Sequence, residues 1–414
     1  MFKKLISLDE AKKRIEEALC PKPIGIEEIP LLKAVGRVLA EDITSPIDVP
    51  PFRRSTVDGY AVKAEDTFNV NEEKPSVLRL KGSVTVGEIS SLTVEKGSTL
   101  EIMTGAPLPA NSDAVVMVEN TTEKNGKIFV FKPAAKGENI MGIGSDIHRN
   151  ETVLKCRNVL SSRELGVLAA LGFTHVKVFK QPKVAIISTG AEIVEPGKPL
   201  PPGKIYDINT YTLTAAISES GGEPIGFGVV QDDEESLKAT LRKAMNAADI
   251  VITSGGVSVG PKDFIPKIID DFGKPGLVVH GVATKPGKPL AVAIVGNKPI
   301  FSLPGHPTSS LLMFHLLIRP ILFKIAGKKM EPHITIKAVI REKLFSARGR
   351  RTFITVTLSR DDAGRWLASP VPTGQSGAIT TLAKADGYVE LKETQQFVEA
   401  GKEVKVFLFK TLEN

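Results

Sequence analysis

Cysteine and aromatic residues are scarce in this 414-residue sequence. Cys20 and Cys156 are its only two cysteines, and such a distant pair can build neither a disulfide framework nor a zinc site. Aromatic residues make up 6% of the chain, which leaves no evident stacking platform for single-stranded nucleic acid. The net charge of +7 is modest and is not concentrated in a basic block. We therefore expect no nucleic-acid partner, and a small anionic ligand explains the excess charge better than DNA does.

Long hydrophobic runs are also lacking. The first residues contain no apolar segment of signal-peptide length. The strongest apolar run, Leu311 to Phe323, is interrupted by His315, Arg319 and Pro320 and is shorter than a membrane span. With 42% hydrophobic and 24% charged residues, the composition is typical of globular proteins. We expect a cytoplasmic protein without a membrane partner, and a chain of this length should fold as two to four domains.

The first half of the chain predicts a helical linking domain with an inserted β domain. Ser7-Leu-Asp-Glu resembles a capping box, and a helical apolar stripe follows over Ala11–Leu19. A helical or mixed segment follows at Ile29–Leu39, and a helix is predicted over Leu160–Leu171. Between these pieces, short alternating runs are separated by Gly, Pro, Asn and Asp, a pattern typical of β structure. We assign residues 1–45 plus 145–181 to the linking domain and 46–144 to the inserted β domain.

The hydrophobic pattern of the second half of the chain changes twice. Over residues 182–328, continuous apolar runs alternate with helical patterns, which predicts a doubly wound, parallel α/β domain. Its last helix is predicted over Thr308–Ile325. Residues 329–414 return to short β runs and predict a small C-terminal β barrel or sandwich. The fold class is therefore a multidomain combination of α/β and β structure.

Polar loops follow four of the predicted α/β strands, and three of these loops contain a carboxylate. In an open α/β sheet, ligands bind beyond the carboxyl ends of the strands. The carboxylates, Glu192, Asp232 and Asp263, would lie on neighbouring loops of that edge and could share a magnesium ion. Taken singly, each of them is more often a helix N-cap, so the metal site depends on all three meeting.

A glycine-rich loop, Ser254–Gly260, precedes one of the predicted helices. Its backbone amides and the helix N-terminus can hold a phosphate, which makes Ser254, Gly255, Gly256 and Ser258 candidate substrate contacts. Pro261 stands where a P-loop would carry its lysine, and this excludes a P-loop NTPase. The alternative for the loop is a tight strand-to-helix turn without a ligand.

A basic turn, Lys285-Pro-Gly-Lys288-Pro, is suited to a phosphate or another tetrahedral oxyanion. A lysine turn of this kind is also common on solvated surfaces, so both interpretations stay open. His306 could serve as a base, but we assign it no catalytic role.

The run Pro51-Phe-Arg-Arg-Ser-Thr-Val-Asp-Gly-Tyr-Ala-Val62 carries the strongest signal. Asp-Gly predicts a turn, so Asp58 should lie at an exposed corner, and the two arginines beside it can attract an oxyanion. For an arbitrary Asp-Gly, a charged β-turn would be the ordinary interpretation. This run, however, resembles the signature of the MoeA/gephyrin E-domain family, the molybdopterin molybdenumtransferases.

Further motifs agree with that family in order and spacing, and they cover nearly the whole chain. They are Met103-Thr-Gly-Ala-Pro-Leu-Pro, Ser188-Thr-Gly-Ala-Glu, Ser254–Asp263, Lys285-Pro-Gly-Lys-Pro, Leu303-Pro-Gly-His-Pro and, more weakly, Pro372-Thr-Gly-Gln-Ser-Gly-Ala. Two departures are small: Thr56-Val57 replaces a common Ala-Met, and Ser376-Gly-Ala replaces a more usual Gly-Ser arrangement.

The resemblance implies an enzyme that takes adenylylated molybdopterin and molybdate, inserts the metal into the dithiolene and releases AMP. It implies that Asp58, Glu192, Asp232 and Asp263 are catalytic, the last three as Mg²⁺ ligands. The implied substrate contacts, beyond the glycine-rich loop, are Thr104, Lys285, Lys288, Ser302, Pro304, Pro307, Arg350 and Ser376. It also implies a homodimer in which Asp58 and Thr104 reach the partner's site, and it suggests the upstream adenylyltransferase as a further partner.

Two alternatives stay open. The related adenylyltransferase shares the α/β domain but does not need the β insert with Asp58. A non-catalytic scaffold is the other, since the gephyrin E-domain also clusters receptors, although Asp58, Asp232 and Asp263 argue against a scaffold that has lost its chemistry. The sequence leaves molybdate and tungstate undistinguished, because both are tetrahedral dianions of nearly equal size.

Overall fold

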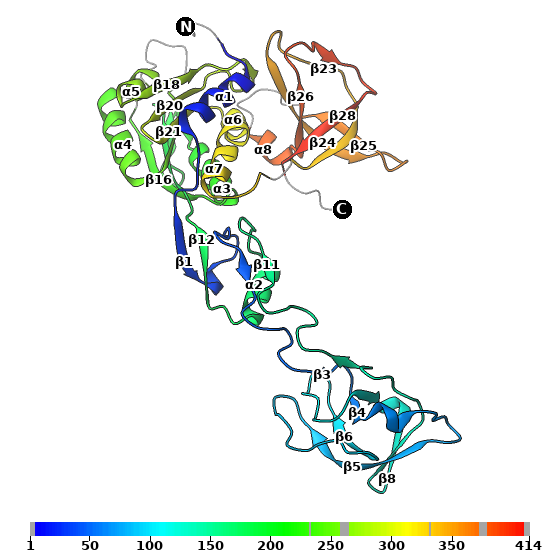
Figure 1. Ribbon diagram of the computed structural model, residues 1–414. Coiled ribbons are helices and arrows are strands. Elements are labelled where there is room, and N and C mark those ends of the chain that lie inside the picture. Colours follow the sequence, from blue (N-terminus) through cyan, green and yellow to red (C-terminus); the bar gives the residue numbers. More distant parts are fainter. Residues whose placement is uncertain (1–4, 232, 257–264, 331–332, 372–378, 410–414) are drawn as a thin grey trace.

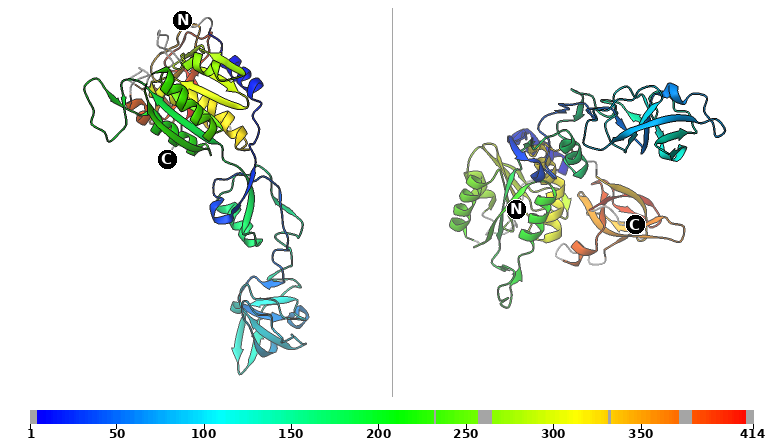
Figure 2. Two further views of the ribbon diagram at one scale, coloured as in Figure 1. Left: turned by 90° about the vertical axis from the view of Figure 1, so that its left-hand side faces the viewer. Right: turned by 90° about the horizontal axis from the view of Figure 1, so that it is seen from below.

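The computed structural model describes residues 5–231, 233–256, 265–330, 333–371 and 379–409 (Figure 1). The molecule is elongated. An α/β domain and a β barrel lie side by side at one end, a linking region follows, and the inserted β domain lies at the other end (Figures 1 and 2). The multidomain fold class predicted from the sequence is confirmed.

The α/β domain is built on one six-stranded sheet. The strands in spatial order are β16 (Glu223–Val230), β13 (Lys183–Thr189), β17 (Ile250–Ser254), β21 (Lys298–Leu303), β20 (Ala291–Val295) and β18 (Pro275–His280). The first four strands are parallel, as predicted, whereas β20 and β18 join as antiparallel strands. The prediction of an entirely parallel sheet is therefore wrong at this edge. β20 and β21 are separated only by Gly296-Asn297, a hairpin connection too short for a parallel crossover.

Helices cover both faces of this sheet. On one face lie α1 (Leu8–Leu19) and α3 (Asn209–Glu219), whose apolar residues pack in one core cluster with β13 and β17. On the other face lie α4 (Glu234–Ala247) and α5 (Ile265–Asp271), which share a second cluster with the alternate residues of the same strands. The side-chain alternation of a strand explains the two clusters.

Helix α1 forms where the capping box predicted it, with Ser7 Oγ accepting from the Glu10 amide at 3.1 Å. Its buried residues belong to the α/β core, although the sequence assigned the helix to the linking domain. An amphipathic stripe shows that a helix packs, but it does not show which sheet it packs against.

The last α/β helix runs over Pro307–Ile325 as α6 (Pro307–Met313), a π turn (Phe314–Ile318) and α7 (Arg319–Ile325). Among the described residues it is the one helix that is long and apolar enough to cross a membrane, with 19 residues. A buried core helix meets the same criterion, and 67% of its apolar window is buried inside the protein. Its interior residues belong to the α/β core cluster.

The linking region is mixed rather than all-helical. β1 (Ile26–Pro30) pairs with β12 (His175–Phe179), β2 (Ile43–Thr44) pairs with β11 (Thr152–Leu154), and α2 (Ser162–Ala170) is the predicted second helix. The segment expected to be helical or mixed holds the end of β1 and one 3₁₀ turn, Leu31–Lys33.

The inserted domain is all-β, as predicted. Its sheet, in spatial order, contains β7 (Ala114–Met117), β4 (Gly59–Val62), β6 (Ser98–Ile102), β5 (Ser76–Val84), β9 (Lys127–Val130) and β8 (Thr121–Lys124). A short pair, β3 (Arg54–Ser55) with β10 (Ile140–Met141), lies where the chain enters and leaves. Further 3₁₀ turns are Ala64–Thr67 and Val118–Asn120.

The C-terminal domain is a closed barrel. Its strands in order are β24 (Arg351–Arg360), β25 (Trp366–Pro370), β22 (Thr335–Ile340), β28 (Glu403–Leu408) and β26 (Gly387–Leu391), and β26 pairs back to β24. The short pair β23 (Leu344–Phe345) with β27 (Phe397–Val398) and helix α8 (Thr380–Lys384) complete it. A strand from the α/β domain, β19 (Thr284–Lys285), adds to β24 in parallel, so the two domains share backbone hydrogen bonds.

Candidate active site

Three loops meet at the carboxyl edge of the parallel strands. In register, Ser188 of β13 pairs with Ser254 of β17, and Ser254 pairs with Leu303 of β21. Because parallel strands point the same way, the loops that follow them leave from one edge. The expectation that Glu192, the start of the glycine-rich loop and the Pro304–Pro307 loop share an edge is met for the described residues.

Glycine at position 255 is required by a close backbone approach. Gly255 has φ +96°, and a Cβ there would lie 2.0 Å from the carbonyl oxygen of Thr189. A Cβ on Gly305 would lie 3.7 Å from the Cα of Gly255, so the two loops approach each other here. The edge is therefore lined by closely packed backbone, and the Gly255 amide donates to the Leu303 carbonyl oxygen at 3.3 Å.

A buried polar network lies directly beneath these loops, and the sequence analysis missed it. Asn209, at the start of α3, donates from Nδ2 to Ser254 Oγ and to the Gly305 carbonyl oxygen, both at 2.7 Å. Asp207 accepts from Ser188 Oγ at 3.1 Å and from Thr210 Oγ1 at 2.5 Å. The signal was present: Asp207-Ile-Asn209-Thr210 is an Asx-rich helix start, and it follows the two-residue pair β14 (Ile193–Val194) with β15 (Ile205–Tyr206).

Asn209 also leaves one polar atom without a protein partner. Asn209 is 5% exposed, and its Oδ1 is buried and accepts no hydrogen bond from the residues that the structure describes. Buried side-chain oxygens almost always have a partner, so this carbonyl marks a place for a donor from a water or a bound molecule. Asn209 thus adds an acceptor to a loop edge otherwise lined by backbone.

Ser302 lies in this region but not at its surface. The residue is fully buried, and its Oγ accepts from Thr253 Oγ1 at 2.9 Å. Pro304 is buried, Pro307 is half-buried at the start of α6, and Gly305 and His306 between them are exposed. The exposed part of this loop is therefore its tip rather than the serine that the resemblance named.

Two cationic segments from different domains come together beside this edge. Lys285 is exposed at the end of β19, its peptide bond to Pro286 is cis, and Lys288 is half-buried. Arg350 directly precedes β24, the barrel strand with which β19 pairs. Among the described residues, the Arg350 side chain has no ion pair. The predicted contacts Lys285 and Arg350, far apart in sequence, are brought to one place.

Only part of the predicted metal site lies in the described residues. Glu192 is exposed, close to where the β13 strand ends, and a Cβ on Gly190 would come within 3.0 Å of its Oε2. Asp232, Asp263, Ser258 and Ser376 lie outside the described residues. Within the described part of the chain, no three His, Cys, Asp or Glu side chains group together as metal ligands. The donor set of three carboxylates suits magnesium.

Asp58 and Thr104 meet in the inserted domain. Asp58 is exposed, as predicted, and its Oδ1 accepts from the Thr104 amide at 2.6 Å and from Thr104 Oγ1 at 2.8 Å. The hydrogen bond from the Thr104 amide, and after it the one from the Thr104 hydroxyl, hold the pKa of Asp58 below its usual value. Position 59 requires glycine, because a Cβ there would lie 1.9 Å from the Val116 carbonyl oxygen.

The two halves of the predicted site are far apart within one chain. Strand β4, which begins directly after Asp58, lies at one end of the elongated molecule, and the α/β sheet lies at the other (Figure 1). The linking region separates them in both further views (Figure 2). Asp58 therefore does not complete the site on its own α/β domain.

Comparisons with known proteins cover the whole chain. Three protein-family models match: the MoeA N-terminal region (domains I and II) over residues 6–172, a probable molybdopterin-binding domain over 185–324, and the MoeA C-terminal region (domain IV) over 337–409. A molybdopterin molybdenumtransferase of Nostoc sp. is 35% identical over 385 residues, covering 92% of this chain and 88% of that protein. The Haemophilus influenzae protein of the same name is 34% identical over 412 residues, covering 99% of this chain and all of its own.

Solved structures agree in fold over the full length. A molybdopterin biosynthesis MoeA protein from Pyrococcus horikosii is 45% identical, with a TM-score of 0.85 over 99% of this chain and 100% of that one. A second structure, a MoeA protein from Pyrococcus horikoshii OT3, is 33% identical with a TM-score of 0.81, covering 98% of this chain and 100% of that one.

Proposed function

Since the chain belongs to the MoeA family of molybdenum-cofactor biosynthesis enzymes, we propose that it inserts molybdate into adenylylated molybdopterin with release of AMP. The curated relatives are named molybdopterin molybdenumtransferases, so the chain is an enzyme of this pathway and neither alternative is favoured. The adenylylated substrate, the release of AMP and the choice of oxyanion are our proposal.

The observation that carries this proposal is the meeting of Lys285 and Arg350. β19 leaves the α/β sheet and pairs with β24 of the barrel, so two cationic side chains from different domains lie beside the edge where the loops converge. A tetrahedral dianion such as molybdate is recognised by cations from more than one direction. The loop that contains Lys288 and the Pro304–Pro307 loop leave the sheet from the same edge. Tungstate has the same shape and charge and fits the same arrangement.

The neighbouring loops supply the nucleotide side of the proposal. In this proposal, amides of the glycine-rich loop other than that of Gly255, which donates to the Leu303 carbonyl oxygen, hold the phosphoanhydride. The unpartnered Asn209 Oδ1 accepts a hydrogen bond from a donor group elsewhere on the nucleotide or from a water. Glu192, Asp232 and Asp263 would hold the magnesium ion, whose charge offsets that of the phosphates. The remaining work of this chain is positioning: the lysines hold the oxyanion while backbone amides hold the nucleotide in line with it.

We propose a homodimer in which each site combines two chains. This is supported by the position of Asp58 and Thr104 at the far end of the molecule from their own α/β domain (Figure 1). A two-fold arrangement makes two equivalent sites, each with one chain's inserted domain beside the other's α/β domain. The upstream adenylyltransferase is the proposed donor of the nucleotide. A cytoplasmic location is proposed as well, where the two free cysteines stay reduced.

An assay of AMP release with and without molybdate tests the reaction. Molybdate-dependent AMP release from adenylylated molybdopterin is expected. An adenylyltransferase would instead consume a nucleotide triphosphate, and a scaffold would release nothing. Competition between molybdate and tungstate in the same assay decides which anion the site prefers.

Mixed dimers test the shared site. Asp58→Asn removes a charge from the inserted domain, and Asp263→Asn removes one from the α/β domain. In a mixed dimer of the two variants, one site receives both defects and the other receives none. Random mixing makes about half of the dimers mixed, so about a quarter of wild-type activity should return. If each site lay within one chain, every site would carry a defect, and no activity would return after verified subunit exchange.

A further inference from the structure

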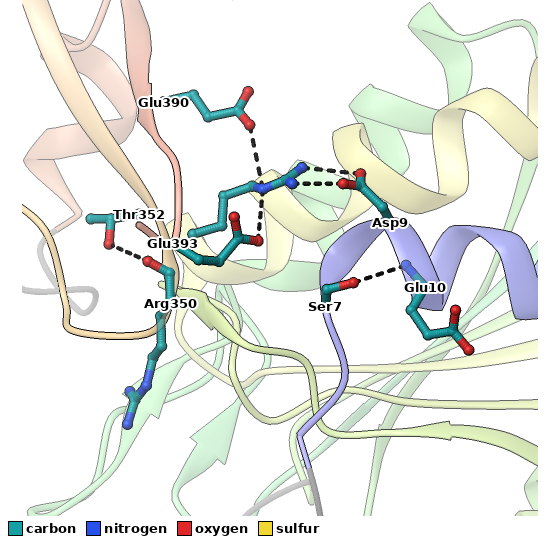
Figure 3. Close-up of polar contacts among 8 residues, drawn as sticks. Ser7, Asp9, Glu10, Arg350, Thr352, Glu390 and Glu393 are labelled. Carbon is teal, nitrogen blue, oxygen red and sulfur yellow. Dashed lines mark hydrogen bonds and ion pairs between the residues drawn. The ribbon is translucent and has the colours of Figure 1, made fainter. Parts of the chain in front are cut away.

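Arg351, the residue after Arg350, is held by three carboxylates. Its guanidinium forms a bidentate pair with Asp9, with Nη1–Oδ1 at 3.0 Å and Nη2–Oδ2 at 2.6 Å. Its Nε lies 3.1 Å from Glu393 Oε1 and 3.5 Å from Glu390 Oε1. Figure 3 draws these contacts between the first turn of α1 and the barrel. We call Asp9, Arg351, Glu390 and Glu393 the Arg351 cluster.

The geometry of the cluster is directional. The Arg351 side chain is 15% exposed, and a planar guanidinium that meets a carboxylate with two parallel bonds fixes orientation as well as distance. Asp9 belongs to the first turn of α1, where the helix dipole favours an acid, and Ser7 caps that turn. Three carboxylates surround the Arg351 guanidinium, which is more negative charge than is needed to neutralise it. The cluster therefore holds Arg351 in one position, although its carboxylates repel one another.

Backbone hydrogen bonds tie the Arg351 cluster to the predicted oxyanion contacts. The Arg351 amide donates to the Ala283 carbonyl oxygen at 2.9 Å, and the Ala283 amide donates to the Ile6 carbonyl oxygen at 2.8 Å. Ile6 lies three residues before Asp9, so the bonds form a closed circuit through α1, β19 and β24. Lys285 follows two residues after Ala283, and Arg350 immediately precedes Arg351.

The two neighbouring arginines are used in opposite ways. Arg350 ends the turn before β24, with its amide donating to the Ala347 carbonyl oxygen at 3.0 Å, and in Figure 3 the Arg350 side chain is directed away from the Arg351 cluster. The turn before them is held by Thr352, whose Oγ1 donates to the Arg350 carbonyl oxygen at 3.1 Å and accepts from the Ala347 amide at 2.9 Å. Arg351 thus pairs with three carboxylates, whereas Arg350 has no ion pair among the described residues and can pair with an anionic ligand.

We propose that Arg351 is a positioning residue for the oxyanion. Anchored by Asp9, it fixes β24 against β19 and so sets the spacing between Lys285 and Arg350. The inference rests on the proposed function, because it names what determines molybdate binding at that same site. Arg351 itself does not touch the substrate.

The test uses Asp9→Asn in the full-length protein. The amide keeps the shape of Asp9 but loses the charge and one acceptor, while Glu390 and Glu393 still pair with Arg351. We expect the molybdate concentration for half-maximal AMP release to rise roughly tenfold, because a small misplacement of binding groups is costly. The value for the pterin nucleotide and the rate at saturating molybdate should stay near wild type. Arg351→Lys, which keeps the charge but loses the bidentate fork, should behave similarly.

The matched control is Glu16→Gln. Glu16 lies on the same helix and also pairs across elements, with Lys324 of α7 at 2.8 Å, but it has no bond to β19 or β24. Its variant should leave the molybdate requirement unchanged. A role limited to stability would lower the melting temperature in Asp9→Asn, or move both substrate requirements together. Either result without a selective molybdate effect overturns the proposal.

A second measurement keeps this inference separate from the proposed function. Amide hydrogen exchange of the peptides that contain Ala283 and Arg351 needs no catalysis, and it should be at least roughly threefold faster in Asp9→Asn than in Glu16→Gln. If wild type shows no molybdate-dependent AMP release, the proposed function fails whatever the exchange shows. If wild type is active and exchange at these amides is unchanged in Asp9→Asn and Arg351→Lys, the positioning role fails alone.

Discussion

The two junctions that connect domains in this chain are built differently. Between the α/β domain and the barrel, β19 pairs with β24, and Phe353 and Tyr388 of the barrel are buried in the α/β core cluster. Between the linking region and the inserted domain, the two passing segments pair with each other through backbone hydrogen bonds such as those between Val49 and Ile147, and no core cluster of the described residues spans both parts. Phe52 at this second junction is 42% exposed.

The difference matches what each junction has to do. In the proposed site, Lys285 and Arg350 would have to keep one spacing to hold a small anion, and they lie where two domains share a core and a sheet. Asp58 is carried on a domain with its own core, connected by two paired segments without a shared core, which agrees with the proposed meeting of Asp58 with a site on a second chain. The residues proposed to hold the oxyanion thus lie at the rigid junction, and Asp58 lies beyond the junction that has no shared core.

Truncating one phenylalanine at each junction should show the largest contrast. Phe353→Ala removes a side chain that is 5% exposed and should cost about 3–5 kcal/mol of unfolding free energy, because it leaves a cavity in a shared core. Phe52→Ala removes an exposed side chain and should cost under about 1 kcal/mol. Denaturant unfolding of both variants measures the difference, and equal losses would contradict the contrast between the junctions.

A glycine-to-alanine substitution in the α/β domain and one near the inserted domain should give the next largest difference in stability loss. Gly255→Ala puts a Cβ 2.0 Å from a backbone carbonyl oxygen at φ +96°, so the backbone must move, and we expect a loss of about 2–4 kcal/mol. Gly144→Ala, near the inserted domain, has φ +67° and meets the tips of two side chains, the exposed His148, which can turn away, and the half-buried Asp48, whose Oδ1 would lose only its bond from the Arg149 amide. Its cost should be about 1 kcal/mol. Melting temperatures rank the two, and the reverse order would contradict the close approach at Gly255.

The pH dependence of stability should also differ between the two junctions, each of which contains a histidine. Burial lowers the pKa of His315 from 6.5 to about 4, and the charges of Arg319 and His333 act in the same direction. The unfolded chain therefore takes up a proton that the folded chain refuses, and the stability from this group is complete above pH 6.5 and declines as the pH falls toward 4. Between pH 6.5 and 5 the wild type should lose about 1.5 kcal/mol through His315 alone.

Replacing His315 by Gln should remove that part of the pH dependence. The control, His148→Gln, changes a side chain that is 76% exposed at the other junction and should leave the wild-type dependence unchanged. Unfolding free energies at the two pH values give the comparison. A His315→Gln protein that loses as much stability as wild type would exclude His315 as the source.

The sequence predicted the elements of the site better than their partners. The ends of β13, β17 and β21 were placed correctly, because buried strands of a parallel sheet read as continuous apolar runs. Asp58 was placed at an exposed corner from its Asp-Gly turn. Both inferences depend on local signals, which a single sequence contains.

What the sequence did not show are contacts between distant segments. β19 is only two residues long, and it is a strand only because it pairs with β24, which lies in another domain. The burial of Ser302 behind Thr253 depends on how two strands face each other. Arg350 and Arg351 look alike in a basic run, and only the three-dimensional structure shows that one is surrounded by acids. Such tertiary choices have no periodicity to detect.

The smallest effect on stability, but a selective effect on function, is expected for Lys285 and Lys288. Replacing both by Ala should change the unfolding free energy by only about 1 kcal/mol, because Lys285 is exposed and Lys288 is half-buried rather than in the core. It should nevertheless raise the molybdate requirement of AMP release roughly tenfold, more than it weakens binding of the pterin nucleotide, if the turn holds the oxyanion.

The matched control is a lysine pair on a turn of the inserted domain. Lys124 and Lys127 face each other across the β8–β9 turn and are both exposed, so their double Ala variant removes the same charge from the other side of the comparison. That variant should leave the molybdate requirement unchanged, because its lysines lie away from the α/β edge. An equal rise in both double variants would indicate a general effect of net charge on anion attraction. An unchanged requirement in the Lys285/Lys288 variant would make that turn a solvated surface and leave Arg350 as the remaining cation of the proposed oxyanion site.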